Sequence, residues 1–137
     1  MQTIKYVFQP HGDERGQLIA FEEFKDIPFH IKRVYYMYDT ADGVIRGQHA
    51  HHTLDQLLVC VHGRCTIIMD NGKEKKAVPL EHPYEGLWVP HGIWHDMTDF
   101  SPGAVLLVFA SELYDPADYI RDYDEFLQIV SEQKNEN

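Results

Sequence analysis

The sequence predicts an all-β fold, a small jelly roll or β-barrel, that ends in one short helix. The first observation is a succession of short segments rich in β-branched and aromatic residues, separated by turn-forming residues, a pattern typical of sandwiches and barrels. The second is that the hydrophobic period becomes helical only near the C-terminus. With 137 residues, 44% of them hydrophobic, the chain is expected to form one domain over residues 1–137.

Several segments are expected to form strands, in addition to the histidine-rich stretch described below. They are residues 2–8, 17–24, 31–39, 56–62, 64–70, 73–78, 86–90, 94–98 and 104–110. The turn HGDERG precedes residues 17–24, and Asn71-Gly72, a strong hairpin signal, precedes residues 73–78. A closed barrel would suit such strands because it leaves no exposed edges.

The hydrophobic period changes from Asp115 onward. Tyr123, Phe126, Leu127 and Val130 follow one another at positions i, i+3, i+4 and i+7, which places them on one face of a helix. We expect this helix to pack on the outside of the barrel or on a partner chain.

Charge and composition exclude some classes of function. The formal net charge of −10 argues against a nucleic-acid binder, which needs a basic face. A small anionic ligand stays possible, because a few arginines can dominate the field in one pocket. No apolar run reaches the ~18 residues of a membrane helix, and we see no signal peptide. The expected compartment is the cytoplasm, where Cys60 and Cys65 would be reduced.

Two segments carry the residues that suggest chemistry. In RGQHAHHTLDQLLVCVHG, residues 46–63, His49 and His51 stand two positions apart, so on a strand they share one face, whereas His52 points the other way. In GLWVPHGIWHDMTD, residues 86–99, His95 completes the pattern PxGxxH. In order and spacing the two segments resemble the paired motifs of the cupins. The resemblance implies a small cupin barrel in which His49, His51 and His95 face one cavity.

These residues leave two uses for the histidines. His49, His51 and His95 could hold zinc or iron, because imidazole suits such ions. Metal-binding cupins usually have a glutamate where Gln56 stands, and an amide is a weak neutral ligand. The glutamine therefore favours a metal-free site in which the histidines transfer protons.

Two further segments extend the resemblance over nearly the whole chain: IPFHIKRVYYMYDT at 27–40 and LLVFASELYDPADYIRDYDEF at 106–126. Together the four segments resemble the sugar 3,4-ketoisomerases, which act on dTDP-4-oxo-6-deoxy-glucose on the way to dTDP-3-amino-3,6-dideoxy sugars. The resemblance implies a barrel without metal or cofactor, and a homodimer whose N-terminal strands are exchanged. The sequence contains no GxGxxG segment that would bind a nicotinamide or flavin.

The reaction of this family explains why histidines are needed. Moving a ketone from C4 to C3 requires a base that removes the C3 proton, an acid that protonates C4, and donors for the oxygen of the intermediate. Histidine titrates near neutral pH and suits the first two roles. By resemblance, His49 is expected to be the C3 base, and His51 to protonate C4 or stabilise the enediolate. His95 is expected to help place the proton at C4.

The resemblance also implies a product and a set of substrate contacts. Members that form the galacto product have arginine in an early RG turn and histidine in the second motif, positions held here by Arg15 and His95. The expected product is therefore dTDP-3-oxo-6-deoxy-galactose. Arg33 and Arg46 are candidates for the substrate diphosphate, which calls for charge-assisted donors. Tyr35 could donate to a sugar oxygen or stack on thymine.

Other functions stay open from the sequence. A metal-dependent cupin, such as a dioxygenase, would use the three histidines as ligands. A non-catalytic sugar-binding cupin would bind the dTDP-sugar and release it unchanged. A 3,5-epimerase has a similar fold and base, but the pair His49 and His51, together with the segment YIRDYD, favours the ketoisomerase.

Overall fold

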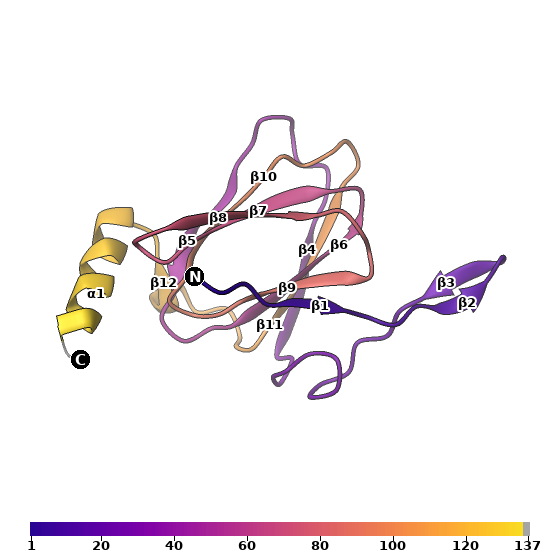
Figure 1. Cartoon of the computed structure of the whole chain (residues 1–137), viewed down its shortest axis with the longest axis horizontal. Helices are drawn as coiled ribbons and strands as arrows, with labels where there is room; N and C mark the ends of the chain where they lie inside the picture. Colours follow the sequence, from indigo (N-terminus) through magenta and orange to yellow (C-terminus); the bar gives the residue numbers. More distant parts are fainter. Residues whose placement is uncertain (136–137) are drawn as a thin grey trace.

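The computed structural model describes residues 1–135, and over this range two antiparallel sheets face each other to form a barrel (Figure 1). The first sheet has the strand order β1 (Lys5–Val7), β9 (Glu85–Val89), β6 (Gln56–His62), β11 (Val105–Ala110), β4 (Arg33–Met37). The second sheet has the order β12 (Tyr119–Ile120), β5 (Arg46–His51), β10 (Trp94–Thr98), β7 (Cys65–Asp70), β8 (Lys75–Leu80). The all-β fold predicted from the sequence is confirmed.

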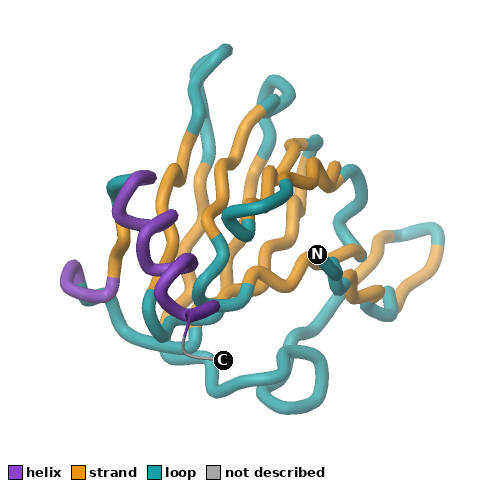
Figure 2. The backbone as a smooth tube through the Cα atoms, turned by 60° about the vertical axis from the view of Figure 1, so that its left-hand side comes forward, coloured by secondary structure: helices purple, strands orange, loops and turns teal. Residues whose placement is uncertain are grey.

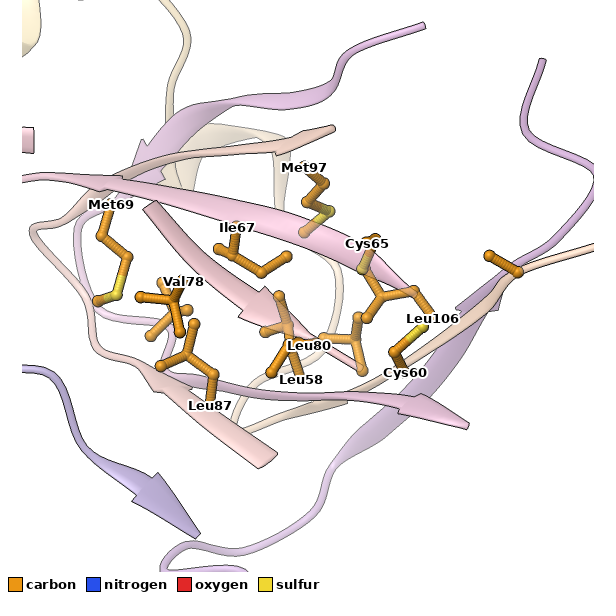
Figure 3. Close-up of a cluster of buried hydrophobic side chains, with 13 residues drawn as sticks. Leu58, Cys60, Cys65, Ile67, Met69, Val78, Leu80, Leu87, Met97 and Leu106 are labelled. Carbon is orange, nitrogen blue, oxygen red and sulfur yellow. The ribbon is translucent and has the colours of Figure 1, made fainter. Parts of the chain in front are cut away.

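The main core lies between the two sheets (Figure 3). It forms because the inward positions of both sheets carry large apolar side chains, each of which stabilises the fold by roughly 1.5–3 kcal/mol when buried. The two cysteines lie in this core as free, buried thiols, as predicted. Its labelled members include Leu58, Leu87 and Leu106 from the first sheet and Ile67, Met69 and Met97 from the second.

Two smaller clusters cover the outer faces of the barrel. Helix α1 (Tyr123–Asn135) packs on the second sheet, where Phe126 contacts Trp94 (Figure 2). The segment between β3 and β4 covers the first sheet and buries Ile27 and Phe29. No helix in the described range is long and apolar enough to cross a membrane.

The predicted strand at residues 17–24 is wrong over most of its length. Only Gly16–Leu18 forms a strand, β3, which pairs with β2 (His11–Asp13) in a hairpin that stands away from the barrel in Figure 1. The strand cannot continue because the carbonyl of Glu22 accepts hydrogen bonds in a tight turn, and Phe24 has φ 58°, in the left-handed region.

The predicted helix begins later than the change of period at Asp115 suggested. Residues Pro116–Asp118 form a single 3-10 turn, which the side chain of Asp115 caps by accepting a hydrogen bond from Ala117 N–H. Tyr119–Ile120 then pairs with β5, and α1 starts at Tyr123. The backbone of residues 119 and 120 is thus committed to the sheet and is not available to a helix.

Candidate active site

A cavity of about 530 Å³ opens between the edge of the first sheet and the edge of the second. Strand β4 supplies one wall with Arg33, Tyr35 and Met37, and β5 supplies the other with Arg46 and His49. On β4, inward side chains alternate, so residues two apart share a wall. On β5, Arg46 and His49 are three apart, and the register shifts between them. Four of the residues predicted to form the site, Arg33, Tyr35, Arg46 and His49, therefore line one cavity.

The three histidines predicted to be catalytic meet at this cavity. The His49 ring lies 4.9 Å from the His51 ring and 4.8 Å from the His95 ring, centroid to centroid. His49 and His95 are directly paired across β5 and β10. His49 faces the cavity, while His51 and His95 are buried with 2% and 0% of their surface exposed.

A bulge beside Gly47 lets the two histidine strands approach. The register between β5 and β10 shifts between His95 and Asp96. Gly47 lies opposite with φ 80°, and a Cβ atom there would meet the His95 carbonyl oxygen at 3.0 Å. Glycine suits this position because it adopts positive φ without strain and leaves room for the facing backbone.

The three imidazoles are neutral at pH 7. Burial lowers the pKa of His49 to about 4, and the nearby charge of Arg121 adds to the effect. Burial lowers the pKa of His51 to about 3 and that of His95 to about 3. The Nε2 atoms of all three are buried and have no hydrogen-bond partner. A neutral imidazole with a free nitrogen can accept a proton, and of the three rings that of His49 lines the cavity.

Tyr35 stands on the wall opposite the histidines. The side-chain amide of Gln56 donates a hydrogen bond of 2.8 Å to its hydroxyl oxygen. Burial raises the pKa of Tyr35 to about 12, so the hydroxyl keeps its proton. The tyrosine is thus a hydrogen-bond donor held in place by an amide.

Three arginines make the cavity electropositive. Arg33, Arg46 and Arg121 all line it, and over residues 1–135 none of them forms an ion pair with a carboxylate. Arg33 is the deepest, because its Nε and Nη2 atoms are buried and have no partner. An unpaired buried guanidinium is costly unless a ligand completes it. The cavity is therefore suited to an anion, although the chain as a whole carries a net charge of −10.

The structure leaves two residues discussed from the sequence outside the cavity. Arg15 lies in the turn of the β2–β3 hairpin, 85% exposed, and its guanidinium pairs with Asp13 at 2.6 Å. His52 is exposed on the outer face of the barrel next to β5. Neither residue is among those that line the cavity.

Sequence reasoning missed Tyr119 and Arg121. The Tyr119 ring lies 4.9 Å from His49 and 4.5 Å from His51, and the Arg121 guanidinium lies 4.3 Å from the Tyr119 ring centroid. The segment YIRDYD contributed to the family resemblance, but no local pattern in it indicated a strand beside β5. The sequence pattern that could have indicated this strand is the alternation of Tyr119 and Arg121 with the buried Ile120 between them.

The histidine cluster contains potential ligands for a metal ion. The ligand atoms of His49, His51 and His95 lie within 4.8 Å of one another, so three imidazoles could contribute to a transition-metal site. No carboxylate completes the set over the described residues, and Gln56, which stands at the position of the usual glutamate, is engaged with Tyr35. Over the described residues the donor set thus consists of three neutral imidazoles.

Comparison with known proteins places these features in a family. The family model described as FdtA, WxcM-like, C-terminal, matches residues 2–131. A curated TDP-4-oxo-6-deoxy-alpha-D-glucose-3,4-oxoisomerase from Aneurinibacillus thermoaerophilus is 49% identical over 119 residues, which cover 87% of this chain and 86% of that protein.

Solved structures agree with this match. A 3,4-ketoisomerase from Helicobacter canadensis is 46% identical and superposes with a TM-score of 0.92, covering 96% of this chain and 98% of that chain. A histidine-to-asparagine variant of the 3,4-ketoisomerase QdtA from Thermoanaerobacterium thermosaccharolyticum, in complex with TDP-4-keto-6-deoxyglucose, is 38% identical with a TM-score of 0.92 over 95% of this chain and 94% of that chain.

Proposed function

Because the chain belongs to the FdtA family of WxcM-like, C-terminal proteins and is a sugar-nucleotide 3,4-ketoisomerase, we propose that it converts TDP-4-oxo-6-deoxy-glucose into the 3-oxo isomer. The observation that carries this choice of chemistry is the cluster of three neutral imidazoles, of which His49 lines the cavity. The isomerisation moves one hydrogen from C3 to C4 and one from O3 to O4. No net oxidation occurs, so proton donors and acceptors suffice. The 3-oxo product then carries the carbonyl group that an aminotransferase would need to form a 3-amino-3,6-dideoxy sugar.

His49 is proposed as the base that removes the C3 proton. It is the histidine of the cluster that lines the cavity, and its Nε2 atom has no partner. His51 and His95 contact its ring from behind, fix its orientation, and offer neutral nitrogens to the imidazolium that forms. We assign these two histidines to the return of the proton to C4.

Tyr35 and Arg33 are proposed to bind the sugar oxygens O3 and O4. Negative charge develops on these oxygens when C3 loses its proton, and preorganised donors stabilise such charge. The Tyr35 hydroxyl keeps its proton and accepts from Gln56, so its own O–H can point to a ligand. The Arg33 guanidinium lies 5.1 Å from the Tyr35 ring centroid and has buried, unpartnered nitrogens.

The position of the histidines supports a galacto product. In the substrate the C3 hydrogen lies on one face of the ring, and in the galacto product the C4 hydrogen lies on that same face. In the gluco product it lies on the opposite face. Imidazoles that lie together on one side of the sugar ring can therefore form the galacto product, whereas the gluco product needs an acid on the other side. The neutral phenol of Tyr35, with its pKa of about 12, is a far weaker acid than the imidazolium of His49.

Arg46 is proposed to bind the diphosphate of the substrate. It is exposed at the mouth of the cavity and lies on the same strand, β5, as His49. Guanidinium groups suit phosphate oxygens because their donors form bidentate, charge-assisted hydrogen bonds.

A homodimer is proposed to complete the site with Arg15. The β2–β3 hairpin that carries Arg15 stands away from its own barrel (Figure 1), and the free edge strand β4 exposes Val34 and Tyr36 by 50% and 60%. An exchanged hairpin would cover such an edge. Sedimentation equilibrium tests this, because a monomer at micromolar concentration would contradict it.

The function is tested by incubating metal-stripped protein with TDP-4-oxo-6-deoxy-glucose and following the sugar ring by NMR. The expected product has a 3-oxo group and a small H4–H5 coupling, as in the galacto configuration; a large coupling would identify the gluco epimer. His49→Asn should abolish turnover, with His52→Asn, an exposed neighbour, as the matched control. Unchanged substrate with the wild-type protein, or full activity of His49→Asn, would contradict the proposal.

A further inference from the structure

The turn between β9 and β10, residues 90–93, contacts both buried histidines of the cluster. The backbone N–H of Gly92 donates a hydrogen bond of 2.8 Å to the carbonyl oxygen of His51. The Nδ1 atom of His95 lies 3.3 Å from the carbonyl oxygen of Ile93. Because a carbonyl oxygen can only accept, Nδ1 carries the hydrogen in this contact, and the lone pair of the His95 ring is left on Nε2. The turn thus places one histidine and sets the tautomer of the other.

A carboxylate from another loop anchors this turn. Atom Oδ1 of Asp55 accepts a hydrogen bond of 2.9 Å from His91 N–H and one of 2.8 Å from His91 Nδ1. Hydrogen bonds to an ionised carboxylate are stronger than those between neutral groups. Because the Asp55 side chain is only 24% exposed, solvent screens this contact less than it screens an ion pair on the open surface. Both the backbone and the ring of His91, the residue before Gly92, are therefore held by Asp55.

Asp55 is itself held by the first sheet. Its backbone N–H donates a hydrogen bond of 2.8 Å to Ser111 Oγ, and its carbonyl oxygen accepts one of 3.0 Å from Ser111 N–H. Ser111 directly follows β11 and Asp55 directly precedes β6, and these two strands are neighbours in the first sheet. Asp55 therefore connects the first sheet to the turn that leads into β10 of the second sheet.

The placement of the two buried histidines matters for the return of the proton to C4. Proton transfer needs a donor and an acceptor within hydrogen-bond reach, and a displacement of about 1 Å can cost up to about 100-fold in rate. Within the described residues, the Nε2 atoms of His51 and His95 have no hydrogen-bond partner that would hold them. The position of these nitrogens therefore depends on the contacts that each histidine makes through its backbone and its Nδ1 atom.

We propose that Asp55 and His91 are positioning residues of the active site, which hold the turn at residues 90–93 so that His51 and His95 present their Nε2 atoms to the reaction. The inference rests on the proposed function, in which these two histidines return the proton to C4. It also predicts an effect that a merely structural contact would not have, because loss of the anchor should change the tautomer of His95.

The test combines steady-state kinetics with NMR of protein labelled with 15N-histidine, because the nitrogen shifts of an imidazole distinguish its two tautomers. Asp55→Ala is expected to lower kcat roughly 10-fold or more while KM changes less than about twofold. The same variant should lower the fraction of His95 that carries its hydrogen on Nδ1. Asp55→Asn should keep most of kcat and the wild-type tautomer, because its amide oxygen can still accept from His91.

His91→Ala is a second variant that keeps the inference testable if Asp55→Ala does not fold, because His91 is exposed. It should lower kcat and change the His95 tautomer in the same way. The matched control is His82→Ala. His82 also pairs with a carboxylate, Glu85 at 3.8 Å, but this pair lies at the start of β9 and the turn follows its end. The control should therefore keep the wild-type kcat and tautomer.

Wild-type kcat in a folded Asp55→Ala or His91→Ala protein would overturn the inference. A lower kcat with an unchanged His95 tautomer would overturn it as well, because the turn would then not act on that histidine. An equal loss of kcat in His82→Ala would also count against it. If the wild-type protein does not turn over the sugar, the proposed function fails, and the tautomer of His95 in Asp55→Ala still decides whether the anchor acts on the cluster.

Discussion

The side-chain amide of Gln56 donates a hydrogen bond of 2.8 Å to the hydroxyl oxygen of Tyr35. The direction of this bond matters, because Gln56 uses an N–H group and leaves the Tyr35 proton free for a ligand. A glutamate at position 56 could only accept, and the Tyr35 hydroxyl would then turn its proton toward the carboxylate. Gln56, which stands where metal-binding cupins usually have a glutamate, thus also sets the direction in which the Tyr35 hydroxyl donates its proton.

Gln56→Glu is therefore expected to lower kcat by roughly 10-fold or more, as the loss of one donor to the developing oxyanion would. Tyr35→Phe should cause a loss of similar size. If both act through one hydrogen bond, the double variant should be no slower than Tyr35→Phe alone. The measurement is a double-mutant cycle on kcat, with thermal unfolding to show that each variant is folded. Additive losses would mean that Gln56 does not act through Tyr35.

The pH dependence of turnover should be unusually flat on the acid side. Because burial lowers the pKa of His49 to about 4, the base stays neutral and active above that pH. We expect kcat/KM to stay constant from pH 8 to pH 5 and to fall with an apparent pKa near 4. An ordinary histidine would lose half of its activity near pH 6.5. Initial rates in buffers of constant ionic strength measure this, and a midpoint near 6.5 would show that the base is not buried His49.

Acid should destabilise the fold through the same histidines. Their pKa values are below the unfolded value of about 6.5, so the unfolded chain binds more protons as the pH falls from about 6.5 toward 4. The free energy of unfolding must therefore decrease as the pH falls through this window. Urea denaturation at pH 7.5, 6.0 and 5.0 measures the slope. An equal stability at all three pH values would contradict the burial of uncharged rings.

Local sequence patterns predicted the parts of the fold that local patterns control. Strands β6 and β10 begin and end where they were predicted, because each is an apolar or alternating run bounded by turn residues. The prediction of a strand at 17–24 is wrong at Phe24, because a turn sets its left-handed backbone and the hydrophobic period of the sequence does not indicate that turn. Strand β12 was missed because two residues carry no periodicity, and their conformation comes from pairing with β5.

The candidate site also has residues that local patterns predict and residues that they do not. Alternation along two strands was enough to bring Tyr35 and His49 to one cavity. Tyr119 and Arg121 reach that cavity only through long-range pairing, and the hydrogen bond between Gln56 and Tyr35 joins strands β6 and β4, which are not adjacent in the sheet. Such contacts form only in the folded barrel, so patterns within single segments do not predict them.

Asp118 should couple the stability of residues 115–121, called the β12 arm here, to ligand binding. Asp118→Ala removes an acceptor of three hydrogen bonds and leaves the N–H groups of Thr53 and Leu54 without their partner. We expect the free energy of unfolding to fall by about 1–3 kcal/mol, and TDP binding to weaken because Tyr119 and Arg121 lose their anchor. Asp115→Ala is the control, since its side chain accepts one hydrogen bond in an exposed turn. Urea denaturation and titration with TDP measure both effects; a destabilised Asp118→Ala protein that binds TDP as tightly as the wild type would show that the arm does not position the diphosphate site.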